Sequence, residues 1–417
     1  MSNSTSTRSD GYCCDEYAAM AVSRRGLLGG AVALAGATTM VGGAVVTASP
    51  AQAASASSVL VVLSLRGAAD GLSLVVPYGD PGYAPARRVT AIPANRVLQP
   101  NGFFGLHPAM TSLEPFWTTG KVAAIHATGL PVANRSHFAA IEEMEDADPG
   151  SSERVGWLNR LVTGTPGSSP LQGFSAGSST IPTSLIGPSS TMSAGGVDDV
   201  ELPGSDEKGR RAKSLRTMWH REKSTLGRSM RTTFEAINAF GPAQAAADTS
   251  DNYPGTGVGQ GLATAARIIR GDVGVEVITV DQGDWDMHTD MGTHTGGWMY
   301  NNAKDLSDAI AAFLGDLGTQ ESKVTLVTIS EFGRRVVEND SAGTDHGYGN
   351  VMFVAGAGVR GGLYHGRWPG LANSYEADLT VTTDYRQVLA DIVSRRFNAS
   401  VAKVFPGLKW QSTGVMW

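Results

Sequence analysis

The stretch that decides the fold lies between residues 324 and 354. It reads Val324-Thr325-Leu326-Val327-Thr328-Ile329-Ser330-Glu331-Phe332-Gly333-Arg334, then Gly343-Thr344-Asp345-His346-Gly347, then the apolar run 351–354. Apolar, β-branched runs of this length are typical of buried strands. Asp345 and His346 are therefore predicted to lie in a glycine-flanked turn between two strands, where a carboxylate and an imidazole can reach one cation.

The rest of the chain repeats this alternation of strand and helix. Five runs are predicted as buried strands: 59–65, 121–126, 275–280, 324–329 and 351–354. Helical patterns occupy 304–317 and 385–397, and Asp384 is a plausible N-cap for the second. The alternation predicts an α/β fold, a doubly wound and mostly parallel sheet sandwiched by helices.

Polar clusters lie at the ends of these strands. Segments 66–70, 134–137, 281–288 and 330–335 follow the first four strands, and Asp345-His346 precedes the fifth. In open α/β sheets the chemistry collects outside the carboxyl ends of the strands. Two clusters of acids and histidines, 284–288 and 345–346, predict a metal site, and a two-metal site in particular.

The cluster Asp284-Trp285-Asp286-Met287-His288 allows two chelating pairs. On an extended segment Asp286 and His288 point the same way. On a helical turn Asp284 and His288 share a face. His294 is a further candidate a few residues on.

Arg135-Ser136-His137-Phe138 opens a predicted helix. Ser136 there can be an N-cap, or a nucleophile activated by a nearby cation. Arg135 can then hold an anionic group with two hydrogen bonds. A metal-independent serine hydrolase is a rival, although the chain has no G-x-S-x-G elbow.

Three other candidates each have a structural alternative. Asp70, directly after the first strand, is a metal ligand or a helix cap. Glu331 ligates a metal or pairs with Arg334. His365 is a late ligand or an ordinary hydrogen-bonded surface histidine.

The N-terminus has the pattern of an export signal. Ser23-Arg24-Arg25-Gly26-Leu27-Leu28 is a twin-arginine signature, an apolar run follows it, and Ala51-Gln52-Ala53 is a small-x-small cleavage pattern. We expect residues 1–53 to be removed. Both cysteines, Cys13 and Cys14, would leave with them, so carboxylates, imidazoles and hydroxyls would have to hold any metal.

Residues 54–417 are expected to form one domain with an insertion at about 163–250. Its first part, 163–204, is rich in Ser, Gly and Pro and predicts surface loops. Its second part, 206–240, is basic and helical, either a solvated helix beside the core or a cap that attracts an anionic substrate. The formal net charge of -6 argues against a nucleic-acid partner. No later run approaches the ~20 apolar residues of a membrane span.

In this order, the motifs 66–72, 135–138, 284–288, 330–334 and 343–347 resemble the family called "domain of unknown function 1501", from about Val59 to the C-terminus. That family is exported and grouped with the alkaline phosphatase/sulfatase superfamily. The resemblance implies that Asp70, Asp345 and His346 build one metal site. Asp286 or Asp284 would build the other with His288, and Ser136 would be the nucleophile between the metals.

The family usually reads Gly-Gly-Trp-Asp-x-His, whereas Asp284 here replaces the second glycine. The third imidazole of the second site has no sure counterpart, and His365 is the candidate for it.

The expected function is a secreted, metal-dependent hydrolase of phosphate or sulfate esters. Zinc is the expected metal, with manganese or magnesium as alternatives, and two ions are expected. Arg135 and Arg334 would hold the anionic oxygens of a small ester or a glycan-linked substrate. The alternative is a non-catalytic, secreted carbohydrate- or envelope-binding protein on a degenerate hydrolase scaffold. The expected partner in export is the twin-arginine machinery.

Overall fold

We describe the protein from a computed structural model, which describes residues 38–41, 44–47, 55–163, 171–202, 209–397 and 399–417. The twin-arginine signature, both cysteines and the Ala51–Ala53 cleavage pattern lie outside these residues. Within them, no helix is both long and apolar enough to cross a membrane.

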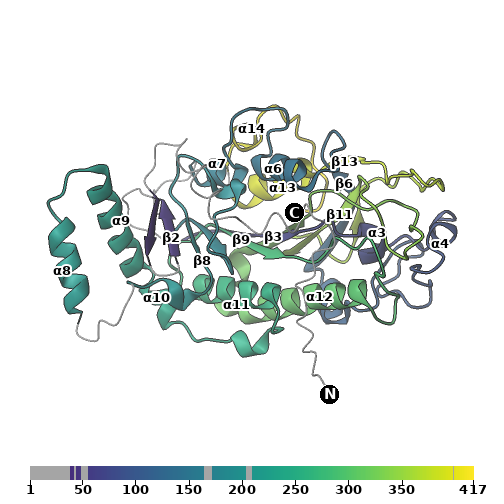
Figure 1. The fold of residues 1–417 in the computed structure, drawn as a ribbon. Coiled ribbons are helices and arrows are strands. Elements are labelled where there is room, and N and C mark those ends of the chain that lie inside the picture. The colour runs from purple at the N-terminus through teal and green to yellow at the C-terminus, as the bar shows by residue number, and fades with distance from the viewer. Residues whose placement is uncertain (1–37, 42–43, 48–54, 164–170, 203–208, 398) are drawn as a thin grey trace, which may run out of the picture.

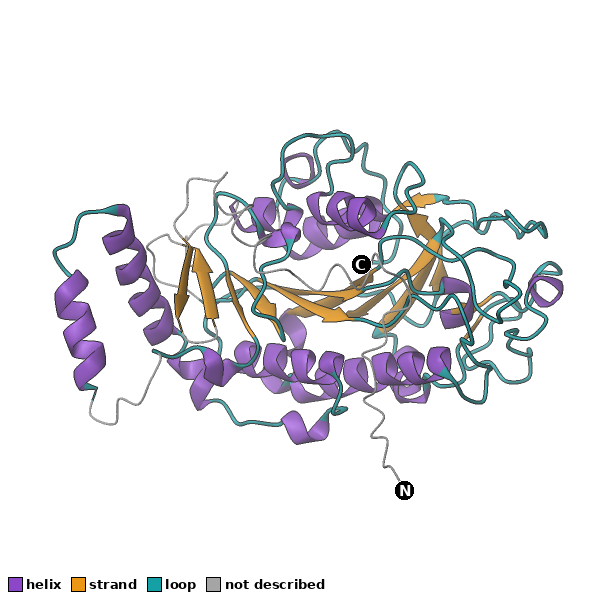
Figure 2. Ribbon diagram, in the orientation of Figure 1, coloured by secondary structure: helices purple, strands orange, loops and turns teal. Residues whose placement is uncertain are grey.

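An 11-stranded mixed sheet runs through the molecule (Figures 1 and 2). The strands of its main path follow the spatial order β1-β2-β8-β7-β9-β3-β10-β11-β6-β12, and β13 also pairs with β6. Their bounds are β1 Thr38–Val41, β2 Ala44–Thr47, β3 Val59–Leu65, β6 Val122–Gly129, β7 Gly173–Ala176, β8 Met192–Ala194, β9 Val277–Gln282, β10 Val324–Ile329, β11 Asn350–Gly356, β12 Tyr364–His365 and β13 Thr383–Asp384. A separate two-stranded sheet pairs β4 (Val75–Val76) with β5 (Gly105–Leu106).

The predicted fold class is confirmed. All five predicted strands exist, with ends shifted by no more than three residues. Strands β7, β9, β3 and β10 are parallel neighbours. The fifth predicted strand, β11, is antiparallel to both β10 and β6, so it begins at the edge of the sheet where those strands end.

Helices cover both faces of the sheet (Figure 2). On one face lie α11 (Gly257–Arg270) and α12 (Trp298–Asp316), and on the other lie α6 (His137–Asp146), α7 (Trp157–Thr163), α13 (Tyr385–Arg396) and α14 (Val401–Val404). The predicted helix 304–317 is the greater part of α12. The predicted helix 385–397 is α13, and the carboxylate of Asp384 accepts a hydrogen bond from the backbone N–H of Arg386 at 3.0 Å, as expected for an N-cap.

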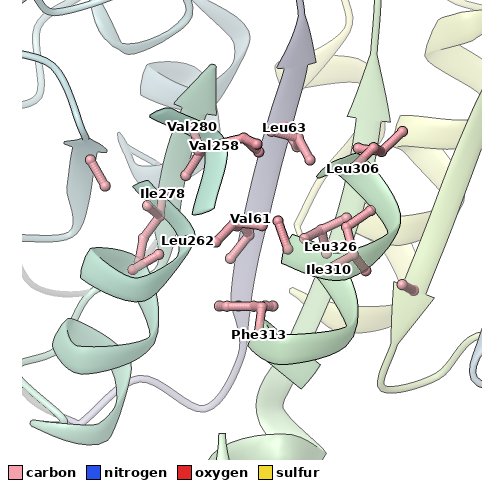
Figure 3. Packing of buried hydrophobic residues seen from close by; sticks show 14 of the residues in the cluster. Val61, Leu63, Val258, Leu262, Ile278, Val280, Leu306, Ile310, Phe313 and Leu326 are labelled. Atoms are coloured by element: carbon pink, nitrogen blue, oxygen red, sulfur yellow. The ribbon is translucent and has the colours of Figure 1, made fainter. Parts of the chain in front are cut away.

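The central strands send alternate side chains to opposite faces. Val61 and Leu63 pack with Leu262 of α11 and Ile310 of α12, as Figure 3 shows. Leu60 and Val62 lie in the cluster on the opposite face, with residues of α13. Because both faces of the strands are buried, the strands appear in the sequence as continuous apolar runs.

The prediction of surface loops at 163–204 is wrong for two short segments. Strands β7 and β8 extend the sheet, and Phe174 in β7 and Met192 in β8 are fully buried. Their small Ser, Gly and Ala neighbours hid the strand pattern. The insertion continues through α8 (Arg210–Trp219), α9 (Thr225–Ala239) and α10 (Gly241–Ala245).

Strands β1 and β2 lie inside the predicted signal and extend one sheet edge, where they pair with each other and β2 pairs with β8. The shorter helices α3 (Gly71–Leu74), α4 (Tyr83–Ala86) and α5 (Glu114–Thr118) lie in the loops after β3 and before β6.

Candidate metal centre

The candidate site lies at one edge of the sheet. Strands β9, β3, β10 and β6 end at this edge, and β11 begins there. Asp286 and His288 follow β9, His346 precedes β11, and His137 opens α6 after β6. Segments that are 209 residues apart in the sequence are therefore brought together by the order of the strands.

Three side chains form a group that could hold one metal ion: His137, Asp286 and His346. The Nε2 atoms of His137 and His346 are 3.1 Å apart. Oδ1 of Asp286 lies 3.7 Å from Nε2 of His137 and 3.4 Å from Nε2 of His346. A tetrahedral ion with bonds of ~2.0–2.1 Å places its ligand atoms about 3.4 Å apart, so these separations fit a zinc-sized ion.

His288 adjoins this group. Its Nε2 atom lies 3.0 Å from Nε2 of His346 and 3.0 Å from Oδ1 of Asp286. Asp286 and His288 are therefore the pair of this segment that lies close together in the structure. Asp284 is exposed and sits in the left-handed region with a φ of 64°, while Asp286 is buried.

Each of the three histidines holds an acceptor at its other ring nitrogen. Nδ1 of His137 contacts Glu331 at 2.8 Å, Nδ1 of His288 contacts Asp345 at 3.0 Å, and Nδ1 of His346 contacts the backbone carbonyl of Arg135 at 2.9 Å. Carbonyls and ionised carboxylates only accept, so each Nδ1 carries a proton. The Nε2 atoms of the three rings then converge, an arrangement that metal-binding histidines share.

The charges of the cluster are strongly coupled. Burial alone would lower the pKa of His137, but hydrogen bonds to Asp286 and Glu331 raise it to about 9. Burial alone would raise the pKa of Asp286, but its contacts with the three histidines and the charge of Arg334 hold it well below its usual range. The carboxylate of Asp286 is thus an anion at neutral pH, as a metal ligand must be.

Backbone contacts hold the three loops of the site together. The N–H of Thr344 donates to the carbonyl of Met287 at 3.0 Å, and the N–H of Arg335 donates to the carbonyl of Asp345 at 2.9 Å. At Gly343 a Cβ atom would lie 2.2 Å from the carbonyl carbon of His288. Only glycine allows this approach, which explains the glycine before the Thr-Asp-His sequence.

Arg334 lies beneath the site and is 1% exposed. Its guanidinium donates to Oδ1 of Asp286 at 2.6 Å. It also donates to four backbone carbonyls, those of Gly67, Ala68, Trp285 and Thr344. These contacts, with one to His288 Nε2 at 3.4 Å, occupy all five N–H groups. Arg334 therefore orients Asp286 and has no donor left for a substrate.

Two predicted ligands lie outside the group. The carboxylate of Asp70 accepts hydrogen bonds from Arg87 at 2.5 and 2.9 Å and from Ser73 at 2.6 Å. Burial would raise the pKa of Asp70, but Arg87 holds it below its usual range. His365 lies on β12, where its Nε2 contacts the carbonyl of Arg360 at 3.0 Å. Neither residue belongs to the group of His137, Asp286 and His346.

Two predicted ligands each contact the Nδ1 atom of a histidine in or beside the group. Glu331 contacts His137 and also accepts from the N–H of Gly67 at 2.8 Å. Asp345 contacts His288 and accepts from Asn339 at 3.0 Å. Carboxylates in this position fix the ring orientation and raise the basicity of a metal-binding imidazole.

Ser136 is the N-cap residue of α6, but its hydroxyl makes no capping hydrogen bond. It is half-buried and directly precedes His137. The backbone carbonyl of Arg135 accepts a hydrogen bond from His346. The guanidinium of Arg135 forms an ion pair with Asp378. Arg135 and Ser136 therefore precede a residue of the group, and the helix makes no capping hydrogen bond with the serine hydroxyl.

His137 is the residue that the sequence reasoning missed. It lies inside the Arg135–Phe138 motif, next to Ser136, which was predicted as the nucleophile. Its side chain is fully buried. The available signal was its position after a strand and at the start of a helix, beside two other acid–histidine clusters.

Asp345→Asn tests the difference between a ligand and a supporting partner. The amide oxygen can still accept from His288, so we expect metal affinity to fall about 10–100-fold rather than vanish. Isothermal titration of the metal-free protein with zinc measures the effect, and Asp340→Asn, an exposed acid in the same loop, is the control. An undiminished affinity in Asp345→Asn would remove Asp345 from the site.

Comparisons with known proteins complete the description of the site. A family model described as "Protein of unknown function (DUF1501)" matches residues 105–393. No curated protein matches the chain.

Among solved structures, the chain is similar to the C-terminal periplasmic domain of EcEptC from Escherichia coli, in complex with zinc. The two are 11% identical, the match covers 77% of each chain, and the TM-score is 0.33. It is also similar to an alkaline phosphatase from the Antarctic bacterium TAB5, with 10% identity, 74% of this chain and 93% of that chain covered, and a TM-score of 0.28.

Proposed function

The chain belongs to the DUF1501 family of proteins of unknown function, and we propose that it is a metal-dependent hydrolase of phosphate or sulfate esters. The observation that carries the proposal is the group His137, Asp286 and His346. Its ligand atoms have the spacing of a tetrahedral ion, and two of its histidines have their other nitrogen bound to an acceptor. Three protein ligands with one open position is the pattern of catalytic zinc sites.

The donor set favours zinc. Two imidazoles and one carboxylate, with a third imidazole adjoining, suit zinc better than magnesium, which prefers oxygen ligands. The described residues bring together one such group. We therefore propose one ion at this group, where the sequence led us to expect two. A divalent ion bound there supplies a positive charge that lowers the pKa of a nearby hydroxyl and withdraws charge from an ester oxygen.

In this proposal each residue of the site has a separate role. Asp286, ionised and oriented by Arg334, balances the positive charge. Glu331 and Asp345 orient His137 and His288. Ser136 is the nucleophile: its Oγ attacks phosphorus or sulfur, the ester bond to the leaving alcohol breaks, and water later hydrolyses the ester formed on Ser136. The N-terminal end of α6 favours the anionic group held there.

Arg135 remains the candidate that holds the anionic oxygens. Its guanidinium is 42% exposed and is paired with Asp378. A substrate would compete with Asp378 for it. We further propose that the protein acts outside the cytoplasm after twin-arginine export, which rests on the Ser23–Leu28 signature and its following apolar run.

Ser136→Ala separates catalysis from metal binding. The hydroxyl makes no capping hydrogen bond, so we expect the fold and the metal content to be retained. Hydrolysis of aryl phosphates or aryl sulfates should fall by at least about 100-fold. The measurement is an ester panel on the zinc-loaded protein, with elemental analysis of both proteins.

His365→Ala is the matched control, because this histidine lies outside the group. A Ser136→Ala protein that keeps its full hydrolytic activity would exclude Ser136 as the nucleophile. A wild-type protein that binds zinc but hydrolyses neither ester class would leave the non-catalytic, envelope-binding alternative.

A further inference from the structure

A basic helical hairpin projects from one end of the molecule. We define it as residues 209–231, which contain α8, the turn after it and the first half of α9. It carries eight of the 33 Lys and Arg residues of the chain: Arg210, Arg211, Lys213, Arg216, Arg221, Lys223, Arg228 and Arg231. Its one acid is Glu222. The hairpin is thus strongly cationic, although the chain has a formal net charge of -6.

Side-chain hydrogen bonds hold the two helices of the hairpin together. Arg231 donates to the carbonyls of Trp219 at 2.9 Å and Glu222 at 2.6 Å, which caps the end of α8. Ser224 caps the start of α9 by accepting from the N–H of Gly227 at 3.1 Å. Arg216 crosses to Asn238 of α9 at 2.5 Å. These contacts hold α8 against α9 in one orientation.

The hairpin carries both exposed cations and exposed apolar side chains. Arg210, Lys213, Arg221 and Lys223 are exposed and make no ion pair with a described residue. On the same hairpin, the side chain of Met218 is 66% exposed and that of Leu226 is 50% exposed. Cations flanked by exposed apolar side chains characterise helices that lie at a membrane interface. A surface for a hydrophilic polyanion needs the cations alone.

The position of the hairpin agrees with a membrane partner. In Figure 1, α8 is the outermost helix at one end of the molecule, and α9 stands between α8 and the strands β1 and β2. Strand β1 packs against α9. The cationic hairpin therefore forms one end of the described structure.

We propose that this hairpin docks the protein on an anionic lipid surface. The exposed cations contact phosphate headgroups, and Met218 and Leu226 enter the interfacial region. The proposal concerns a surface at the β1–β2 end of the sheet and does not depend on the metal centre, which is built on β6, β9, β10 and β11.

The test is cosedimentation with vesicles. The exported protein is mixed with phosphatidylcholine vesicles, with and without phosphatidylglycerol, at low and high salt. We expect binding only when phosphatidylglycerol is present, and weaker binding as salt increases. In the variant Arg210→Gln/Lys213→Gln/Lys223→Gln, the partition coefficient should fall about 100-fold, because each cation near an anionic membrane is worth ~1 kcal/mol.

Two further variants make the result specific. Arg88→Gln/Lys403→Gln/Lys409→Gln removes three exposed cations elsewhere and should bind as the wild type does. Met218→Ser/Leu226→Ser keeps every charge and should weaken binding to the same vesicles at high salt. All three variants change exposed side chains, and their circular dichroism should match that of the wild type.

Three outcomes would overturn the proposal. Equal binding by the hairpin variant and the wild type would show that the exposed cations contact solvent and not the membrane. Equal losses of vesicle binding in the hairpin and control variants would show that binding depends on the net charge of the protein and not on the hairpin. Binding to soluble polyphosphate or single-stranded DNA that is as tight as binding to vesicles, and insensitive to Met218→Ser/Leu226→Ser, would assign the hairpin to a hydrophilic polyanion.

Discussion

His346→Gln is expected to abolish stoichiometric zinc binding. The Nε2 atom of His346 lies within 3.1 Å of the corresponding atoms of His137 and His288 and 3.4 Å from Asp286, so it is central to the group. A carboxylate that only orients a ligand histidine is worth ~10–100-fold in metal affinity, so loss of the histidine itself should cost more than about 100-fold. Elemental analysis of the purified variant measures the metal content directly.

Thermal unfolding gives a second measurement on the same variant. Zinc at 100 times its dissociation constant should stabilise the wild-type protein by about 2.7 kcal/mol, and His346→Gln should show no such increase. His365→Gln is the matched control, since its ring hydrogen-bonds the carbonyl of Arg360 and lies outside the group. If zinc stabilises His346→Gln as much as His365→Gln, the group is not a metal site and the proposed function fails with it.

Arg334→Met is expected to have the largest effect on stability. The guanidinium is 1% exposed and donates to four carbonyls and to Asp286, so its loss leaves buried acceptors without a donor and removes the guanidinium charge beside a buried carboxylate. Breaking a buried charge pair in this way costs about 3–5 kcal/mol. The free energy of unfolding of the metal-free protein, measured with urea, should fall by that amount.

The neighbouring residue supplies the control. Arg335 pairs with Glu376, whose side chain is 75% exposed, so Arg335→Met should cost no more than about 1 kcal/mol. Similar small losses in the two variants would mean that Arg334 does not anchor the loops of the site. A stable Arg334→Met protein that binds zinc normally would also show that Asp286 needs no cation behind it.

The sequence did not distinguish the residues that would bind the metal from the residues that only orient those ligands. Glu331 and Asp345 stand in motifs that carry histidines or a strand end, and they were predicted as ligands. In the structure each bonds the far nitrogen of a histidine. A sequence pattern shows which residue types are near a strand end, but which of two oxygens or nitrogens faces the common centre depends on side-chain rotamers set by packing.

Local patterns by themselves determined the fold class of this protein. Strand β3 and strand β10 were predicted with their observed bounds, because a strand covered on both faces is apolar throughout. The clustering of polar residues at one edge followed from strand direction, and Asp286 with His288 was available as a pair from their spacing alone. The short strands β7 and β8 escaped because Gly, Ser and Ala carry little strand signal.

Only the tertiary structure decided the composition of the site. His137 entered because α6 begins where β6 ends, beside β11, although the residue is 209 positions from His346. Asp70 lies outside the site because the buried guanidinium of Arg87 donates hydrogen bonds to both of its carboxylate oxygens. Arg334 changed from a substrate ligand to an internal cation because four backbone carbonyls surround it. Each of these outcomes depends on which distant segments meet, and the pairing order of the strands sets that.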